Sequence, residues 1–206
     1  MPERLQPAAI GFFSHSGWVA VVSLAAADSS ADVVERTRWL LTSAPLPREP
    51  YHDAKRRGRE DAEEIVAAAA QEARALAVEA TTSLSASVGA LGYELIAAGV
   101  VLGGRPGVTL SQALSTHAAT HGAEGWLFRE ALMEASQKCG LKTVGVPERE
   151  LPGRAASALG TSESAVSELV QQIGRRCGPP WGRDQKAAAL AAIVALHSSW
   201  EFSPRP

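Results

Sequence analysis

This sequence has few cysteines, a small net charge and no long apolar run, and each of these features argues against a class of protein. The two cysteines, Cys139 and Cys177, stand alone, which argues against a zinc ribbon or a CxxC redox motif. The net charge of −2 gives no global attraction to nucleic acid, so such binding needs a local basic patch. No stretch is apolar enough to span a membrane, and the first residues lack the pattern of a signal peptide. We therefore expect a soluble, cytoplasmic protein that does not bind membranes.

The sequence does contain enough apolar residues for one ordinary domain. Of its 206 residues, 46% are hydrophobic and 20% are charged, a composition that supports a buried core. We predict a single domain over residues 1–206, with a basic loop segment at residues 43–60 and a helical C-terminal part at residues 148–200. Three prolines in the loop segment are expected to prevent regular structure there.

Hydrophobic periodicity predicts the order of strands and helices. Three antiparallel strands, followed by two parallel strands with crossover helices, satisfy the connection rules for sheets. The sequence therefore predicts an α/β fold with a mixed sheet of about five strands and helices on both faces. The predicted elements are a strand hairpin at 8–26 that turns at 14–17, strands at 32–42, 93–102 and 141–146, helices at 53–88 and 110–138, and helices after residue 147.

One stretch of the predicted 110–138 helix gathers groups that can bind a metal. His117, His121 and Glu124 lie three and four residues apart, so their side chains share one helix face. Imidazole and carboxylate ligands suit zinc, manganese or iron. Gly122 and Gly125 are expected to let another backbone come close at this point. Hydrogen bonding of the histidines to neighbouring groups, with Glu124 in a salt bridge, is an alternative that the sequence leaves open.

Three segments resemble the RuvC branch of the ribonuclease H-like superfamily. The resemblance implies a ribonuclease H-like fold of nuclease ancestry, and it extends to bacterial proteins with an HxxxHxxE stretch and a PPW…DQK ending. The segments are IGFFSHSGWVAVVSL, similar to the family's glycine-bearing first hairpin; HGAEGWLFREALMEASQKCGLKTVGVPERE, similar to its second crossover helix and last strand; and LGTSESAVSELVQQIGRRCGPPWGRDQKAAALAAIVAL, similar to its closing segment.

The resemblance also implies where catalytic carboxylates should lie, and most of them are missing. Nucleases of this family gather several carboxylates around two magnesium ions. One belongs on the first strand and one near the end of the fourth, but IGFFSHS and GVVLGG contain no acid. Asp184 on the closing helix matches, while Lys186 or Ala187 fills the position of a further acid. His15 stands near the place of the first acid and is a candidate replacement.

Two functions fit this pattern. In the first, which the missing acids favour, the chain is a catalytically degenerate nuclease relative that binds nucleic acid or a protein partner. In the second, it is a divergent metal-dependent nuclease with Asp184 and Glu124 as catalytic residues. A divalent metal (Mg, Mn or Zn) would then be held by Asp184, Glu124, His117 and His121. Groups within about 6 Å of a common point can share a metal, so the position of Asp184 relative to the histidines tests the second function.

The candidate nucleic-acid contacts are basic and aromatic side chains. Phosphates attract clustered Lys and Arg, and an exposed tryptophan can stack on a base. Each residue also has a plain structural interpretation: a solvated helix start for the basic cluster, burial for the tryptophan and a helix cap for Asp184. A homo-oligomer is compatible with either function. The candidate contacts are Lys55, Arg56, Arg57, Lys186 and Trp181.

Overall fold

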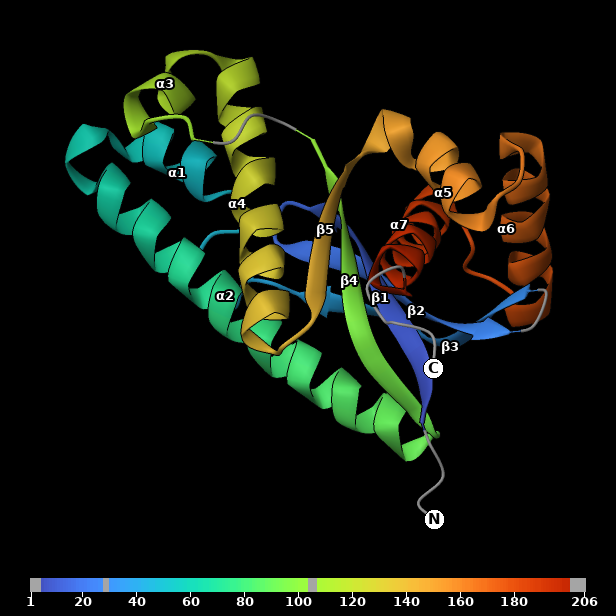
Figure 1. Ribbon diagram of the computed structural model, residues 1–206. Coiled ribbons are helices and arrows are strands. Elements are labelled where there is room, and N and C mark those ends of the chain that lie inside the picture. The colour runs from blue at the N-terminus through green and yellow to red at the C-terminus, as the bar shows by residue number, and fades with distance from the viewer. Residues whose placement is uncertain (1–4, 28–29, 104–106, 201–206) are drawn as a thin grey trace.

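A mixed sheet of five strands forms the centre of the molecule (Figure 1). The computed structural model describes residues 5–27, 30–103 and 107–200, so both ends of the predicted 1–206 domain lie outside the described residues. The order across the sheet is β3-β2-β1-β4-β5. The first three strands in the chain pair antiparallel, and β4 and β5 run parallel to β1, which confirms the predicted arrangement. The strands are β1 (Gln6–His15), β2 (Trp18–Ala27), β3 (Ser30–Leu40), β4 (Tyr93–Leu102) and β5 (Lys142–Pro147).

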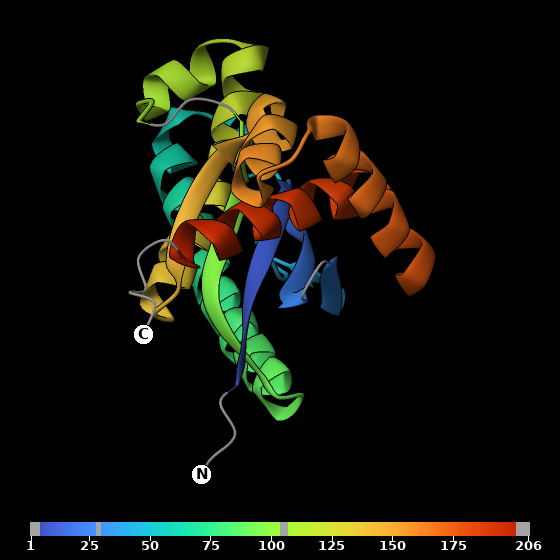
Figure 2. The ribbon, with the colours of Figure 1, turned by 45° about the vertical axis from the view of Figure 1, so that its right-hand side comes forward.

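Helices cover both faces of this sheet (Figures 1 and 2). Successive residues of a strand point to opposite faces, so Phe12 of β1 enters the core beneath α2 and α4, while Phe13 enters the core beneath α5, α6 and α7. None of the helices in the described ranges is both long and apolar enough to cross a membrane. The helices are α1 (Pro50–Arg57), α2 (Arg59–Ala90), α3 (Leu110–Ser115), α4 (His117–Lys138), the 3-10 helix η1 (Glu148–Glu150), α5 (Leu151–Leu159), α6 (Glu163–Cys177) and α7 (Arg183–Trp200).

Two glycines let α7 lie directly on the middle of the sheet. A Cβ atom on Gly11 of β1 would lie 1.8 Å from the carbonyl oxygen of Ala188, and one on Gly99 of β4 would lie 2.1 Å from that of Ala191. Both strands must therefore lack side chains where the helix crosses them. The helix contributes only methyl groups at these points, and Ala188 and Ala191 are fully buried. This close crossing places the first turn of α7 at the C-terminal end of β1.

The helices differ from the predicted ones at two breaks. The predicted 53–88 helix is divided into α1 and α2 at Gly58, whose φ of 103° favours glycine. The predicted 110–138 helix is divided into α3 and α4 at Thr116, whose backbone is extended. Thr116 caps α4, because its side chain accepts a hydrogen bond from the backbone N–H of Ala119.

The prolines of residues 43–60 do not prevent helix formation. Pro50 occupies the start of α1, where its missing N–H is not needed and its fixed φ already suits a helix. The expectation of irregular structure throughout this segment is therefore wrong over Pro50–Arg57. The correction matters for function, because α1 packs against α4.

Candidate functional site

A carboxylate from α4 caps the N-terminus of α1. Oε2 of Glu124 accepts hydrogen bonds from the backbone N–H groups of Tyr51 (3.1 Å) and His52 (3.3 Å), two of the N–H groups that a helix start leaves without an intrahelical partner. Glu49, the residue before the helix, forms no such cap. A negative group is favoured at a helix N-terminus, so Glu124 fastens α1 to α4.

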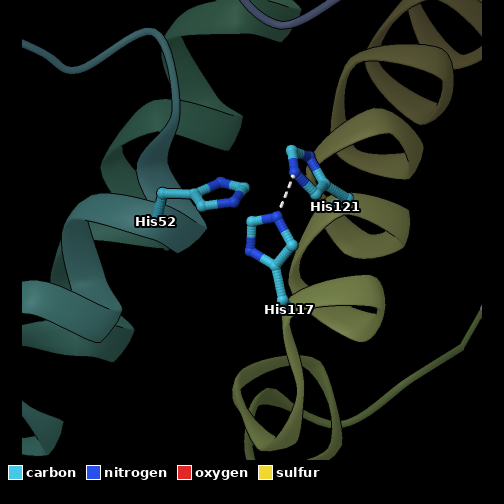
Figure 3. Close-up of side chains that lie close together, drawn as sticks. All are labelled: His52, His117 and His121. Carbon is cyan, nitrogen blue, oxygen red and sulfur yellow. Dashed lines mark hydrogen bonds between the residues drawn. The ribbon is translucent and has the colours of Figure 1, made fainter.

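The same carboxylate oxygen orients the ring of His52. Nδ1 of His52 lies 3.0 Å from Oε2 of Glu124. When Nδ1 donates to this carboxylate, Nε2 carries the free lone pair of the ring. Nε2 is buried and has no hydrogen-bond partner, and the ring points toward His117 and His121 (Figure 3).

Burial raises the pKa of two groups in this region, Glu124 and Tyr51. The Glu124 side chain is 1% exposed, and burial raises its pKa to about 7, although hydrogen bonds from His52 and Tyr51 act in the opposite direction. Burial, together with the charge of Glu124, also raises the pKa of Tyr51. Oε2 of Glu124 accepts three hydrogen bonds, while Oε1 is buried without a hydrogen-bond partner.

His52, His117 and His121 form a group between α1 and α4 that we call the histidine cluster (Figure 3). One ring nitrogen of each lies within 4.8 Å of the others, and the Nε2 atoms of His117 and His121 are 3.0 Å apart. The ring centre of His52 lies 4.5 Å from that of His121 and 5.6 Å from that of His117. Among the described residues, this is the group of three metal-binding side chains that the fold brings together.

The glycines of this stretch do not receive another backbone. A Cβ atom on Gly122 would meet nothing within 4 Å, and one on Gly125 would lie 2.3 Å from Nη1 of Arg129. The expectation of a close backbone approach is therefore wrong. Gly125 instead leaves room for Arg129, whose Nε donates a hydrogen bond to the carbonyl of Val101 on β4 (3.1 Å).

The end of the sheet where the family resemblance places carboxylates holds other groups. β1 contains no acid, and the one acid of β4, Glu94, lies near its opposite end. Phe13 lies near the end of β1 and is 7% exposed. Nη2 of Arg129 lies 3.4 Å from where a Cβ of Gly103, just after β4, would be. Burial lowers the pKa of Arg129, while the charge of Glu148 acts in the opposite direction. Phe13 and Arg129 are not ligands for magnesium, which prefers carboxylate oxygens. The carboxylate beside Arg129 is that of Glu148, which follows β5 and is bound by Arg183.

Asp184 lies at this same end of the sheet and pairs with His15. Its Oδ2 is 3.0 Å from Nε2 of His15. Helix α7, which carries Asp184, lies on the face of the sheet opposite α4 (Figures 1 and 2). The four residues predicted to share a metal are therefore not brought together. His117 and His121 join His52 with Glu124 behind it, and Asp184 joins His15.

Aromatic and cationic side chains stack beside His15. Its ring lies parallel to that of Trp18, with centres 4.2 Å apart and an interplanar angle of 11°. The guanidinium carbon of Arg38 lies 3.7 Å from the centre of the Trp18 ring. His15 also meets Phe13 in an edge-to-face contact, and the guanidinium carbon of Arg183 lies 5.5 Å from the centre of the Phe13 ring. We call Arg38, Trp18, His15 and Arg183 the stacked row; it runs from the edge strand β3 to the start of α7.

The basic residues predicted to contact nucleic acid lie on two separate helices. Arg56 and Arg57 each form an ion pair with Asp53 inside α1, both at 2.8 Å. Lys55 is exposed on the same helix, and Lys186 is exposed on α7. The pairs within α1 match the solvated helix start that was the alternative interpretation of this cluster.

Trp181 is used for packing. A Cβ atom on Gly174 of α6 would lie 2.2 Å from the Trp181 ring, so the ring rests on this glycine. Its Nε1 donates a hydrogen bond to the carbonyl of Val170 (2.9 Å). The tryptophan that lies among cationic groups is instead Trp18.

Sequence reasoning missed His52, Trp18 and Arg38. His52 belongs to the proline-containing segment that was expected to be irregular, although Pro50 followed by an acid three residues later is typical of a helix start. Trp18 and Arg38 lie on neighbouring strands whose register pairs Trp18 with Leu40. Their contact depends on that register, which periodicity alone does not supply.

Comparison with known proteins finds likeness in structure only. No family model matches the chain, and no curated protein matches it. A Thermus thermophilus RuvC structure matches with a TM-score of 0.51 and 12% identity over 91% of this chain and 92% of the other. A T. thermophilus RuvC in complex with a Holliday junction substrate matches with a TM-score of 0.54 and 11% identity over 95% and 96%. The chain has a RuvC-like ribonuclease H fold.

Proposed function

We propose that this protein is a catalytically degenerate relative of RuvC-type nucleases that binds nucleic acid through the stacked row. The observation that carries the proposal is the lack of carboxylates on the C-terminal ends of β1 and β4. At these ends, where the family would place carboxylates, the strands carry no acid, and the guanidinium of Arg129 lies beside Gly103. Two-metal hydrolysis needs anionic oxygen ligands for both ions, and a nearby arginine repels divalent cations.

Arg38 is the centre of the proposed contact surface. It is exposed, lies against the Trp18 ring, and has no acidic partner within the described residues. An arginine that rests on an aromatic ring loses less side-chain conformational entropy on binding than an arginine that moves freely in solvent. Its guanidinium offers paired N–H donors to a phosphate and a planar face to an unstacked base.

Nucleic acid is favoured over a protein partner by the composition of the row. Arg38, Trp18, His15 and Arg183 present cations and rings with no aliphatic side chain among them, which is typical of phosphate and base recognition. Arg183 is partly neutralised by Glu148, since its Nε donates to Oε1 at 3.1 Å. One structural neighbour is a RuvC in complex with a Holliday junction substrate, so branched DNA is the first ligand to test.

The test is a binding titration, followed by fluorescence anisotropy, against four-way junction, duplex and single-stranded DNA at salt concentrations between about 50 and 200 mM. Over this range a protein that makes about six phosphate contacts loses roughly a thousandfold in affinity. Arg38→Ala is expected to weaken binding several-fold and to lower the salt slope by about 0.9. Arg154→Ala is the matched control, because Arg154 on α5 pairs with Glu150 away from the row. No binding at low salt, or equal effects of the two variants, would contradict the proposal.

A divergent metal-dependent nuclease is the second candidate. It is supported by the contact of His15 with Asp184 at the end of the sheet, because both side chains can bind a metal. Two ligands are fewer than the three that open metal sites use, so this candidate ranks second. Cleavage of the same DNA substrates in Mn²⁺, abolished by Asp184→Asn, would establish it and overturn the degenerate assignment.

A further inference from the structure

We propose that the histidine cluster binds a divalent transition metal of the zinc class, with His52, His117 and His121 as ligands and Glu124 as the residue that orients His52. The site lies between α1 and α4. It is separate from the strand ends where the fold family places its carboxylates, and it does not depend on nucleic-acid binding by the stacked row.

The spacing of the nitrogens suits a tetrahedral ion. Two imidazole nitrogens bound to zinc at about 2.0–2.1 Å lie roughly 3.3 Å apart in tetrahedral geometry. The Nε2 atoms of His117 and His121 are already 3.0 Å apart. The third nitrogen lies within 4.8 Å of both, so side-chain movements of about 1.5 Å or less bring all three to zinc-binding distances.

The unpartnered nitrogen of His52 is a second observation that points to a ligand. A hydrogen bond between His117 and His121 accounts for their own close approach. It leaves Nε2 of His52 buried beside them without any partner, and a buried polar atom without a partner is costly. A metal ion at the centre of the cluster would give this lone pair a partner.

Glu124 completes the arrangement that metal-binding histidines ordinarily show. Such histidines usually donate the other ring N–H to a carboxylate, which fixes the tautomer and the ring orientation. Nδ1 of His52 makes this contact with Glu124 at 3.0 Å, and the backbone N–H groups of Tyr51 and His52 hold the carboxylate in turn.

The ligand set selects the class of metal. Three neutral imidazoles favour Zn²⁺, Co²⁺, Ni²⁺ or Cu²⁺ over Mg²⁺ and Ca²⁺, which prefer oxygen ligands. His117 and His121 are exposed, so the fourth position faces solvent and is available to water or an external anion. One ligand comes from α1 and two from α4, and metal binding therefore also fastens these helices together.

The experiment measures metal binding to the full chain after treatment with a chelator. Titration calorimetry with ZnCl₂, and the visible absorption of four-coordinate Co²⁺, are expected to show one site per chain, whereas MgCl₂ gives no heat. His52→Ala, His117→Ala and His121→Ala should each weaken Zn²⁺ binding at least tenfold, and Glu124→Gln should weaken it about 10- to 100-fold. His197→Gln, which removes a histidine from α7 on the other face, should leave the affinity unchanged.

Two outcomes would overturn the proposal. One is the absence of Zn²⁺ binding by the wild-type chain. The other is binding that His52→Ala leaves intact, which would reduce the site to a surface chelate of His117 and His121. Replacement of the two exposed histidines leaves the core untouched, so far-ultraviolet circular dichroism of those variants separates loss of a ligand from loss of the fold.

Discussion

Nδ1 of His52 and Oε2 of Glu124 lie 3.0 Å apart, so one buried carboxylate both caps α1 and orients a member of the histidine cluster. Glu124→Ala removes both contacts and leaves two N–H groups at the helix start without an acceptor. We expect it to lower the free energy of unfolding by about 2 kcal/mol, measured by urea denaturation of the metal-free protein. Glu168→Ala, an exposed change on α6, should stay within about 0.5 kcal/mol. Equal losses in the two variants would show that the cap contributes nothing.

The raised pKa of Glu124 predicts a pH dependence with a definite sign. A carboxyl group whose pKa rises from 4.5 to about 7 on folding binds its proton more tightly in the folded state. The wild type should therefore lose stability as the pH rises from 4.5 to 7, relative to Glu124→Gln, which does not titrate. The free energy of unfolding of Glu124→Gln should exceed that of the wild type by an amount that grows by up to roughly 3 kcal/mol across that pH window and stays constant above it. Urea denaturation with EDTA at several pH values measures this difference, and a flat difference would refute the shift.

The crossing of α7 over the sheet predicts opposite effects at two glycines. Gly11→Ala places a methyl group 1.8 Å from a backbone oxygen of α7, which neither element can relieve without moving. We expect this variant to lose at least about 3 kcal/mol of its free energy of unfolding, or to fail to fold. Gly122→Ala meets nothing within 4 Å inside α4 and should stabilise the protein by about 0.5–1 kcal/mol. Thermal unfolding of the two variants tests both expectations. A Gly11→Ala variant as stable as the wild type would show that α7 does not lie in close contact with β1 at Gly11.

The break between α1 and α2 predicts a backbone effect at Gly58. Its φ of 103° and ψ of 176° lie in a region that other residues rarely enter. Nothing lies within 4 Å of a would-be Cβ, so Gly58→Ala should cost about 1–3 kcal/mol through backbone strain alone. Gly89→Ala, in α2 and also without close neighbours, is the control and should be neutral or stabilising. A neutral Gly58→Ala, seen by urea denaturation, would favour the single helix that the sequence pattern predicts.

The strand order was predictable because it rests on local pattern. Alternation of apolar residues marks β1 and β2, and the glycines after β4 mark its end. The breaks at Gly58 and Thr116 were not predictable in the same way. Gly58 lies in a charged run compatible with a continuous helix, whereas in the structure α1 turns away from α2 and packs on α4. Local propensity does not contain that contact.

The site was predictable only within one element. Helical spacing brought His117 and His121 together, since four residues are one turn of the same helix. Spacing does not tell which face of a sheet a helix covers, so Asp184 was expected beside Glu124 and lies on the opposite face beside His15. His52 reaches the cluster from a distant segment, and only the folded arrangement of α1 and α4 shows that contact.

The close seating of α7 also bears on how the chain assembles. β1 is the first described strand and α7 the last described helix, yet Gly11 and Ala188 are in direct backbone contact. Contacts between such distant parts of a chain form late, and they make folding slower. During synthesis, β1 emerges from the ribosome long before the helix that covers it. Until α7 arrives, the middle of the sheet is a strip of bare backbone at Gly11 and Gly99, so the nascent protein depends on α7 to shield β1 and β4.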